Sequence, residues 1–440
     1  MSSSSTDNIT FKLNPGGQLQ GKARVPGDKS ISHRSIMLGS LAEGTTEVSG
    51  FLEGDDSLAT LKAFRAMGVD ISGPENGRVT IKGVGLNGLK PSEDDLYLGN
   101  SGTSMRLMCG ILAGQQFNSV LTGDKSLSSR PMRRVIDPLL QMGASISATE
   151  NGTSPINISV AKGLQGIEYT LPVASAQIKS CLLLAGLYAD GKTCVTEPAP
   201  TRDHTERMLQ GFGYTVVRDG ARVCLRGQGQ LQGGKIDVPA DISSAAFFMV
   251  GASIAAGSDI TLQHVGINPT RTGVIDILRL MGANIEISNE KEVGGEPVAD
   301  IRIRSSQLKG ITIPEELVPL AIDEFPVLFV AAACASGQTV LTGAKELRVK
   351  ESDRIQVMAD GLQIMGIDAT PTEDGIIIEG GELQGGTVTS HGDHRISMSF
   401  AMAALRCKGG VVIEDCANVN TSFPGFVDLA KGLGLSISTE

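Results

Sequence analysis

The chain has 440 residues, of which 41% are hydrophobic and 20% are charged, a composition typical of a soluble globular protein of two or three domains. A formal net charge of −10, the absence of Trp and an aromatic content of only 4% argue against nucleic acid and anionic membranes as partners. Because the chain has no apolar run of about 18 residues and no signal-peptide pattern at its start, we expect a cytoplasmic protein without a membrane span.

The first informative stretch runs from Pro26 to Arg34, between a short alternating strand at 22–25 and an apolar helical run at 36–42. Two fixed cations and two hydroxyls therefore lie where a strand turns into a helix. The N–H groups and the dipole of a helix start favour an anion there. An ordinary capped helix with solvated bases fits the same residues. How often the chain repeats this arrangement therefore decides between a helix cap and an anion site.

A unit of about 70 residues occurs six times along the chain. Each unit reads as a strand, a helix that is apolar all round, a strand, an amphipathic helix, and a strand or hairpin. The apolar helices are expected to end at Gly44, Gly114, Gly191, Gly257, Gly337 and Gly409. The amphipathic helices are expected to end at Gly68, Gly143, Gly213, Gly282, Gly366 and Gly434. A solenoid is the alternative, but this repeat is longer than solenoid repeats usually are.

Each apolar helix is preceded by a polar cluster. The six clusters are residues 29–34, 100–106, 175–179, 241–244, 323–324 and 391–395. A single cluster is explained by helix capping, but six clusters, several of them basic, indicate an anionic ligand in a shared cleft. The turn at 99–103 resembles a backbone nest for phosphate.

Two further segments are rich in charged residues. Residues 127–134 place three guanidinium groups at a helix start, where they suit phosphate or carboxylate. Residues 348–354 mix bases with acids, which fits proton transfer beside an anion as well as a solvated charge run.

The sequence predicts neither a metal nor a nucleotide cofactor. The five His include only His391 and His394 as a close pair, without carboxylates at ligand spacing, and the seven dispersed Cys form no CxxC pair. We expect these Cys to be reduced, most of them as small core residues. No GxxxxGK[ST] loop occurs, and no GxGxxG with a downstream acid.

Six units divide into two domains of three, with a boundary near 238–241. The strand near residues 11–13 then lacks partners in the first domain, and we expect it to return to the second. The fold class is thus α/β, with two domains of three βαβαββ repeats around buried helices.

The motifs PGDKSISHR, LGNSGTSMR, RPM, SAQIK, RDHTE, NPTR, IDEFP, RVKESDR and DHRISM occur in this order. Together they closely resemble the EPSP synthase (3-phosphoshikimate 1-carboxyvinyltransferase) family, over about residues 10 to 437, and several are similar to its class II members. The resemblance implies an inside-out α/β barrel fold of the EPT/RTPC type. It places residues 1–27 with 242–440 in one discontinuous domain and residues 28–241 in the other, with the active-site cleft between them.

The implied reaction belongs to the shikimate pathway of chorismate and aromatic amino acid biosynthesis. It transfers the enolpyruvyl group of phosphoenolpyruvate to the 5-hydroxyl of shikimate 3-phosphate and releases phosphate. The resemblance further implies a monomer that needs no cofactor and binds glyphosate at the phosphoenolpyruvate site. Phosphate and carboxylate groups on both substrates agree with the basic helix starts.

The resemblance also assigns site residues. Shikimate 3-phosphate is expected to contact Lys29, Ser30, Arg34, Ser175, Ala176, Gln177, Arg202, Asp323 and Lys350. Phosphoenolpyruvate is expected to contact Lys29, Asn100, Gly102, Arg130, Gln177, Arg354 and Arg395. Asp323 is the expected base on the 5-hydroxyl, assisted by Lys350, and Glu351 or Lys29 is the expected proton donor to the methylene carbon.

Three positions depart from the family pattern. Ala176 stands where many relatives have a second Ser, and Thr421 stands where class I members have a Lys. Gly102 stands where glyphosate-tolerant class II members often have Ala, so the sequence does not predict tolerance.

Two other functions fit parts of the sequence. The family of UDP-N-acetylglucosamine enolpyruvyl transferases shares the fold and the donor, but it carries a reactive Cys where this chain has Lys125. A non-catalytic scaffold that binds an anionic metabolite is the second alternative. Asp323, Lys350 and Glu351 argue against a scaffold, because binding alone needs no acid and base together.

Overall fold

The computed structural model describes residues 9–440, whose contacts form two compact units. The N-terminal unit comprises residues 27–238 with 292–296, and the C-terminal unit comprises residues 9–26, 239–291 and 297–440. The chain thus changes unit at residues 26 and 238, and the resemblance places the domain limits at 27 and 241. The assignment of the two units to the two family domains stays a prediction.

The N-terminal unit contains three four-stranded sheets, each with one parallel and two antiparallel strand pairs. Their orders are β14-β3-β5-β4, β6-β7-β9-β8 and β10-β11-β13-β12. The strands are β3 (Thr45–Ser49), β4 (Asp70–Glu75), β5 (Arg78–Lys82), β6 (Leu96–Tyr97), β7 (Ser119–Thr122), β8 (Ser145–Ser147), β9 (Ile156–Ser159), β10 (Glu168–Thr170), β11 (Lys192–Thr196), β12 (Val216–Asp219), β13 (Arg222–Arg226) and β14 (Lys235–Asp237).

Three helices of this unit are largely buried and three are amphipathic. The buried helices are α1 (Lys29–Leu41), α3 (Gly102–Ala113) and α5 (Ala176–Gly186). The amphipathic helices are α2 (Asp55–Ala66), α4 (Arg133–Gln141) and α6 (His204–Gly211), and a short 3-10 helix, η1, spans Leu127–Ser129.

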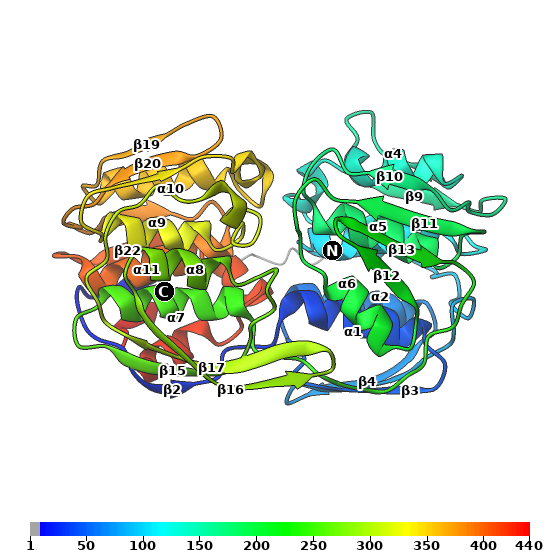
Figure 1. Cartoon of the computed structure of the whole chain (residues 1–440), viewed down its shortest axis with the longest axis horizontal. Helices are drawn as coiled ribbons and strands as arrows, with labels where there is room; N and C mark the ends of the chain where they lie inside the picture. Colours follow the sequence, from blue (N-terminus) through cyan, green and yellow to red (C-terminus); the bar gives the residue numbers. More distant parts are fainter. Residues whose placement is uncertain (1–8) are drawn as a thin grey trace. The chain divides into compact units, whose positions relative to one another are not determined.

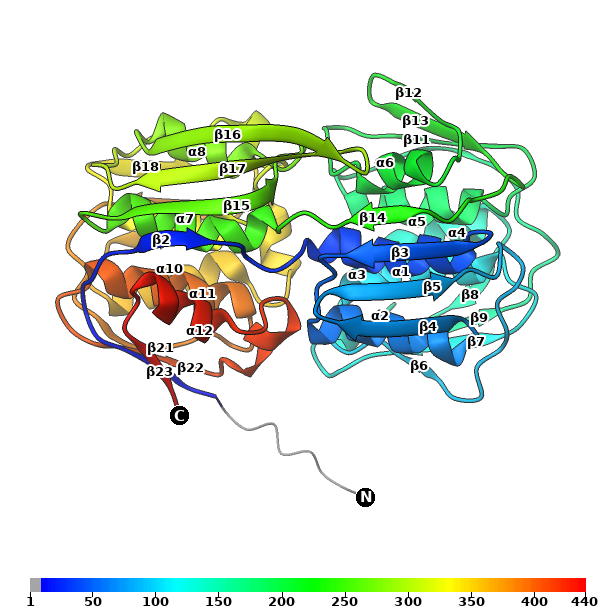
Figure 2. The same ribbon diagram turned by 90° about the horizontal axis from the view of Figure 1, so that it is seen from below.

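The C-terminal unit repeats this plan with the sheets β16-β17-β15-β2, β18-β20-β19 and β21-β22-β1-β23. Figure 2 shows the first of these sheets with its four strands in that order. The strands are β1 (Phe11–Leu13), β2 (Gln20–Ala23), β15 (Asp259–Gly266), β16 (Asn284–Val293), β17 (Glu296–Arg304), β18 (Gln338–Leu341), β19 (Ala369–Pro371), β20 (Ile376–Glu379), β21 (Gly386–Thr389), β22 (Val411–Glu414) and β23 (Ile437–Thr439). As expected, the strand at 11–13 pairs in this unit, with β22 and β23.

The buried helices here are α7 (Ile242–Ile254), α9 (Phe325–Ala333) and α11 (His394–Ala403), which pack on one another (Figure 1). The amphipathic helices are α8 (Gly273–Leu280), α10 (Arg354–Ile364) and α12 (Phe426–Leu433). The 3-10 helices are η2 (Glu315–Leu317), η3 (Lys345–Val349), η4 (Ala404–Arg406) and η5 (Ala417–Thr421). Every residue of α7 is buried, because apolar and small side chains surround its axis.

These elements confirm the predicted fold class: six copies of the repeat, three in each unit, with a separate hydrophobic core around each set of buried helices. Five copies have a four-stranded sheet, and the copy that contains α9 has the three strands β18, β20 and β19. Within residues 9–440, none of the helices combines the length and the apolar character that a bilayer span needs.

The glycines behave differently in the two helix series. All six glycines that end the amphipathic helices have a positive φ, from 79° to 115°, as predicted for helix C-termini. Among the buried helices, the predicted end is confirmed for α3, whose C-cap is Gly114. It is wrong for the other five, which stop before their glycines, and α5 ends at Gly186 rather than at Gly191. Gly191 has a φ of 90°, a left-handed geometry that cannot continue the helix and instead leads into β11.

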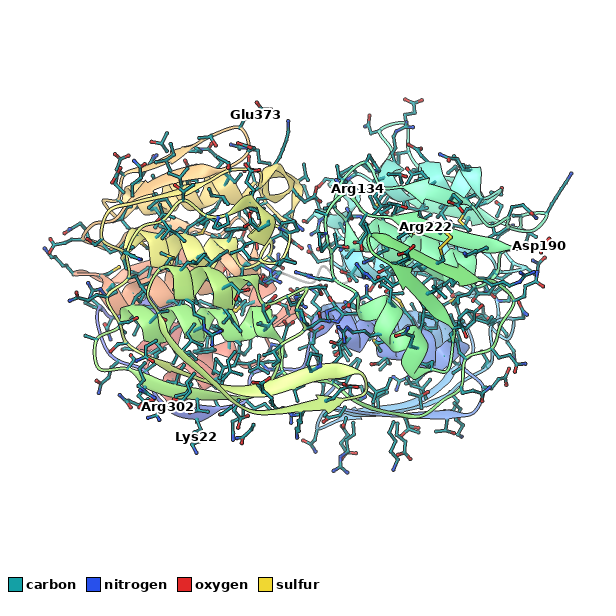
Figure 3. All side chains as sticks on the ribbon, in the orientation of Figure 1. Lys22, Arg134, Asp190, Arg222, Arg302 and Glu373 are labelled. Atoms are coloured by element: carbon teal, nitrogen blue, oxygen red, sulfur yellow. A yellow bond between two sulfur atoms is a disulfide. The ribbon has the colours of Figure 1, made fainter. Side chains whose placement is uncertain are left out.

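The prediction that all cysteines are reduced is wrong for one pair. Cys194 on β11 lies directly opposite Cys224 on β13, and the two form a disulfide, drawn in yellow near Arg222 in Figure 3. Thirty residues separate them, so no short Cys motif marks the bond in the sequence. The other five cysteines are free, and four of these are buried, as expected.

Candidate active site

The three buried helix starts of the N-terminal unit are capped by side chains. Asp28, Ser101 and Ser175 each accept a hydrogen bond from the backbone N–H three residues ahead, at 2.9, 3.1 and 3.4 Å. Capping therefore accounts for these three residues. The basic and polar residues that follow the caps need a separate explanation.

The start of α1 carries Lys29 and Arg34, which have different partners. The ammonium group of Lys29 pairs with the carboxylate of Asp56 on α2. Arg34 donates to the Thr205 hydroxyl on α6 at 2.7 Å and to the Ser180 hydroxyl on α5 at 2.9 Å. Burial lowers the pKa of Arg34 to about 10, so its guanidinium still carries a charge at neutral pH. Three elements thus hold one buried cation in place.

The start of α3 brings three predicted phosphoenolpyruvate residues together. Arg130 donates from Nη2 to the side-chain oxygen of Asn100 at 2.6 Å and from Nη1 to its backbone carbonyl at 3.2 Å. A Cβ on Gly102 would lie 3.2 Å from Nη1 of both Arg130 and Arg106, so glycine leaves room for these guanidinium groups. Asn100 is itself fixed by a 2.7 Å bond from its side-chain amide to Asp124.

Gln177 links the start of α5 to α3. Its side-chain oxygen accepts from Arg106, and its amide nitrogen donates to the Thr103 hydroxyl at 3.1 Å. Arg106 was not among the predicted site residues. The LGNSGTSMR motif contains it, but an Arg one turn into an apolar helix gives no sign in the sequence that it faces a site on the neighbouring helix.

The three guanidinium groups of residues 130–134 do not act as one set. Helix α4 begins only at Arg133, so Arg130 lies before the helix and turns towards Asn100. Arg133 instead donates to the backbone carbonyl of Glu150 at 3.0 Å. The structure therefore places Arg130, and not Arg133, beside the α3 start.

His33 is a buried residue that sequence reasoning left without a role. Its Nδ1 lies 2.8 Å from the Thr60 hydroxyl and 3.1 Å from the Ser104 hydroxyl, and its Nε2 lies 3.3 Å from the hydroxyl of the cap residue Ser101. Burial, reinforced by the charges of Lys29 and Arg34, holds the pKa of His33 well below its ordinary value of 6.5. A neutral imidazole thus joins α1, α2 and α3 behind the α3 start.

In the C-terminal unit, Arg354 lies at the centre of an acidic cluster. Its guanidinium donates to Asp323 at 3.2 Å, to Glu351 at 2.6 Å and to Asp393 at 2.8 Å, and its side chain is only 1% exposed. Lys350 lies 3.3 Å from the same oxygen of Asp323. Burial alone would lower the pKa of Arg354, but the three carboxylates, Asp393 foremost, raise it.

The helix starts of this unit are braced in a similar way. Asp393 caps α11 by accepting from the N–H of Arg395 at 3.0 Å, and it was missed because a capping Asp gives no sign of a second partner. The Arg395 guanidinium lies 4.0 Å from Glu324 at the start of α9. In the NPTR motif, Arg271 donates to the Ser243 hydroxyl at 2.7 Å and lies 3.2 Å from Asp241, the cap of α7.

Pairs at the outer surface differ from these clusters. Arg302 and Glu373, labelled in Figure 3, pair with Asp259 and Lys345 at 2.6 and 2.8 Å through largely exposed side chains. Such exposed pairs contribute little to stability, because water and salt screen the charges. Among residues 9–440, no three His, Cys, Asp or Glu side chains are grouped as a metal site would require.

The family model for EPSP synthase (3-phosphoshikimate 1-carboxyvinyltransferase) matches residues 13–429. The chain belongs to the EPSP synthase family. It is 69% identical to the 3-phosphoshikimate 1-carboxyvinyltransferases of Alkalilimnicola ehrlichii and Methylococcus capsulatus, covering 98% of this chain in both alignments and 97% and 99% of the two relatives. A solved structure of EPSP synthase from Acinetobacter baumannii is similar with a TM-score of 0.88 and 62% identity, over 98% of this chain and 100% of that one.

Two of the positions that depart from the family pattern, Ala176 and Thr421, can now be placed in the structure. Ala176 is the first residue of α5, where its backbone N–H belongs to the helix start but its side chain offers no hydrogen bond. Thr421 donates its hydroxyl to the Asn418 carbonyl at 2.7 Å and is 8% exposed. Neither side chain supplies the hydroxyl or ammonium group that the family pattern leads us to expect at these two positions.

Proposed function

We propose that this member of the EPSP synthase family transfers the enolpyruvyl group of phosphoenolpyruvate to the 5-hydroxyl of shikimate 3-phosphate and releases phosphate. One observation carries the proposal. The family match runs through both units, and the residues that the family motifs assign to anions are buried or half-buried, with Arg34, Arg130 and Arg354 held by further side chains. We further propose that residues of both units act on the same pair of substrates.

For shikimate 3-phosphate, the proposed carboxylate contacts are Ser30 and Arg34. The proposed phosphate contacts are the start of α5, with Ser175, the backbone of Ala176 and Gln177, together with Arg202. Helix N–H groups and a guanidinium form the usual site for a phosphate dianion, which supports this assignment. Lys29 serves both substrates in this proposal, since it stands at the start of α1.

For phosphoenolpyruvate, the proposed phosphate contacts are Lys29, Asn100, Gly102, Arg130 and Gln177. Lys29 pairs with Asp56 and Arg130 with Asn100, so both cations are already oriented before a ligand binds. Orienting binding groups in advance lowers the entropy that binding loses.

The proposed carboxylate contacts for phosphoenolpyruvate are Arg354 and Arg395. An incoming carboxylate competes with Asp323 and Glu351 for the Nη atoms of Arg354. Asp323 thereby becomes available as the base on the 5-hydroxyl, with Lys350 3.3 Å from the same carboxylate.

Proton donation follows from the same exchange. Glu351, whose contact with the Arg354 guanidinium the ligand displaces, is one proposed donor of the proton to the methylene carbon. Lys29 is the other candidate donor. A tetrahedral adduct then forms. Its collapse expels phosphate, with Lys29 placed to assist, while the new methyl group returns a proton to the residue that donated it, so that the carbon–carbon double bond of the enolpyruvyl group is restored. In this proposal Asp323 and Glu351 are partners of Arg354 before the ligand binds, and they act as base and proton donor once the ligand carboxylate binds Arg354.

The test is phosphate release with defined substrates. We expect release only when shikimate 3-phosphate and phosphoenolpyruvate are both present, and we expect glyphosate to compete with phosphoenolpyruvate. Release with UDP-N-acetylglucosamine as acceptor would instead favour the other enolpyruvyl transferase family. Lys125, where that family has Cys, argues against this outcome. We also propose a monomer in the cytoplasm, for which light scattering and cell fractionation are the measurements.

A further inference from the structure

A buried charge cluster lies beneath the start of α5 in the N-terminal unit. The Nζ of Lys179 is 3.0 Å from Glu197 and 2.8 Å from Glu206, and the side chain of Lys179 is 0% exposed. Arg218 contacts the same two carboxylates, at 3.2 and 3.7 Å, from a side chain that is 37% exposed. The cluster therefore contains two cations and two anions, three of them buried.

Stability alone does not account for this cluster. Removing two charges from water costs more than many buried ion pairs regain, and apolar residues of similar volume often stabilise a protein at least as well. Lys179 belongs to SAQIK and Glu206 to RDHTE, yet neither residue has a role in the proposed reaction. The segments that the cluster holds in place therefore indicate its role.

Glu197 closes the segment that leads to Arg202. Its Oε2 accepts from the backbone N–H of Thr201 at 3.1 Å and also from the Thr201 hydroxyl. This is the same oxygen that Lys179 contacts. The backbone before Arg202 is thus tied to a carboxylate that Lys179 fixes.

Lys179 is also tied to the other side of the proposed phosphate site. Its backbone N–H donates to the carbonyl of Ser175, one helical turn earlier, at 3.2 Å. Glu206, its second partner, is next to Thr205, whose hydroxyl holds Arg34. Through its backbone and its ammonium group, Lys179 therefore connects the α5 start, the segment before Arg202 and the support of Arg34.

We infer that Lys179 is a positioning residue for shikimate 3-phosphate, acting through Glu197 and Thr201 on Arg202 without touching the substrate. The inference rests on the proposed function. The donor-side residues Asn100 and Arg130 are held separately, by Asp124 and by each other. The effect that Lys179 exerts through Glu197, Thr201 and Arg202 is therefore expected mainly on the acceptor.

Steady-state kinetics of Lys179→Met test the inference. The apparent KM for shikimate 3-phosphate rises by about tenfold or more, the effect of losing one charge-assisted hydrogen bond to the phosphate, whereas the KM for phosphoenolpyruvate stays within about twofold. Lys192→Met is the matched control, because it removes the same charge from an exposed position on β11 and leaves both constants unchanged. Equal changes in the two constants, or no change, would overturn the role of Lys179.

Thr201→Val provides a second variant that leaves the ion pairs in place. It removes only the hydroxyl bonded to Glu197, and we expect it to raise the acceptor KM without affecting the donor KM. If Lys179→Met fails to fold, this variant carries the test, and an unchanged acceptor KM overturns the inference. Absence of turnover in the wild-type protein would instead refute the proposed function.

Discussion

Replacing Gly102 by Ala puts one methyl group at the start of α3, where two guanidinium groups approach the backbone. The new Cβ would lie 3.2 Å from Nη1 of both Arg106 and Arg130, so each must move by a few tenths of an ångström. Arg130 is held by Asn100 at 2.6 and 3.2 Å, which limits how far it can retreat without losing that orientation. Crowding of this kind costs about 1–3 kcal/mol.

Because each 1.4 kcal/mol changes an equilibrium constant tenfold, we expect the KM for phosphoenolpyruvate to rise by about 10- to 100-fold in Gly102→Ala. The KM for shikimate 3-phosphate should change by less than about threefold, since its proposed phosphate contacts lie on α5 and the segment before α6. Phosphate release at saturating acceptor measures both. Gly234→Ala is the control, because a Cβ there meets no atom within 4 Å and the residue has no positive φ. An unchanged donor KM in Gly102→Ala would refute the role of this glycine.

Three further results are expected. In Asp323→Ala, turnover falls by orders of magnitude while circular dichroism shows an intact fold; persistent activity would mean that another group is the base. Burial holds the pKa of His33 in the folded protein well below its ordinary value of 6.5. Below pH 6.5 the unfolded chain therefore binds one more proton at this residue than the folded protein does. The free energy of unfolding then decreases by up to about 1.4 kcal/mol for each pH unit. Urea unfolding of His33→Asn at several pH values should lack this contribution, and parallel curves for both proteins would contradict it. Thiol titration of the denatured, unreduced protein should find five of the seven cysteines, and seven after reduction; seven before reduction would exclude the bond between Cys194 and Cys224.

The repeated architecture could be predicted because local sequence signals mark the start and the end of the elements in each unit. An apolar run, a polar residue before it and a glycine after it recur six times, and these are local features. The ends of five of the six buried helices, all but α3, were misplaced for a local reason as well. Gly191 was interpreted as a helix end, whereas its positive φ begins the following strand.

Contacts between distant elements could not be predicted. Arg354 and Asp393 are 39 residues apart, and neither residue type indicates that they bind each other. His33 looked like an isolated histidine because its partners Thr60 and Ser104 lie on other helices. Residue order shows which groups are available, but the packing of α1, α2 and α3 decides which of them meet.

The position of β1 has a consequence for how the protein is made. This strand lies between β22 and β23, and Thr10 and Glu440 exchange two backbone hydrogen bonds of 2.9 and 3.0 Å. A ribosome adding about 5–20 residues per second needs about 20–80 s for the roughly 400 residues between β1 and its partners. During that time the strand is already synthesised but cannot pair, whereas residues 27–238 are complete midway. The first strand to leave the ribosome is thus among the last to pair with its neighbours in a sheet.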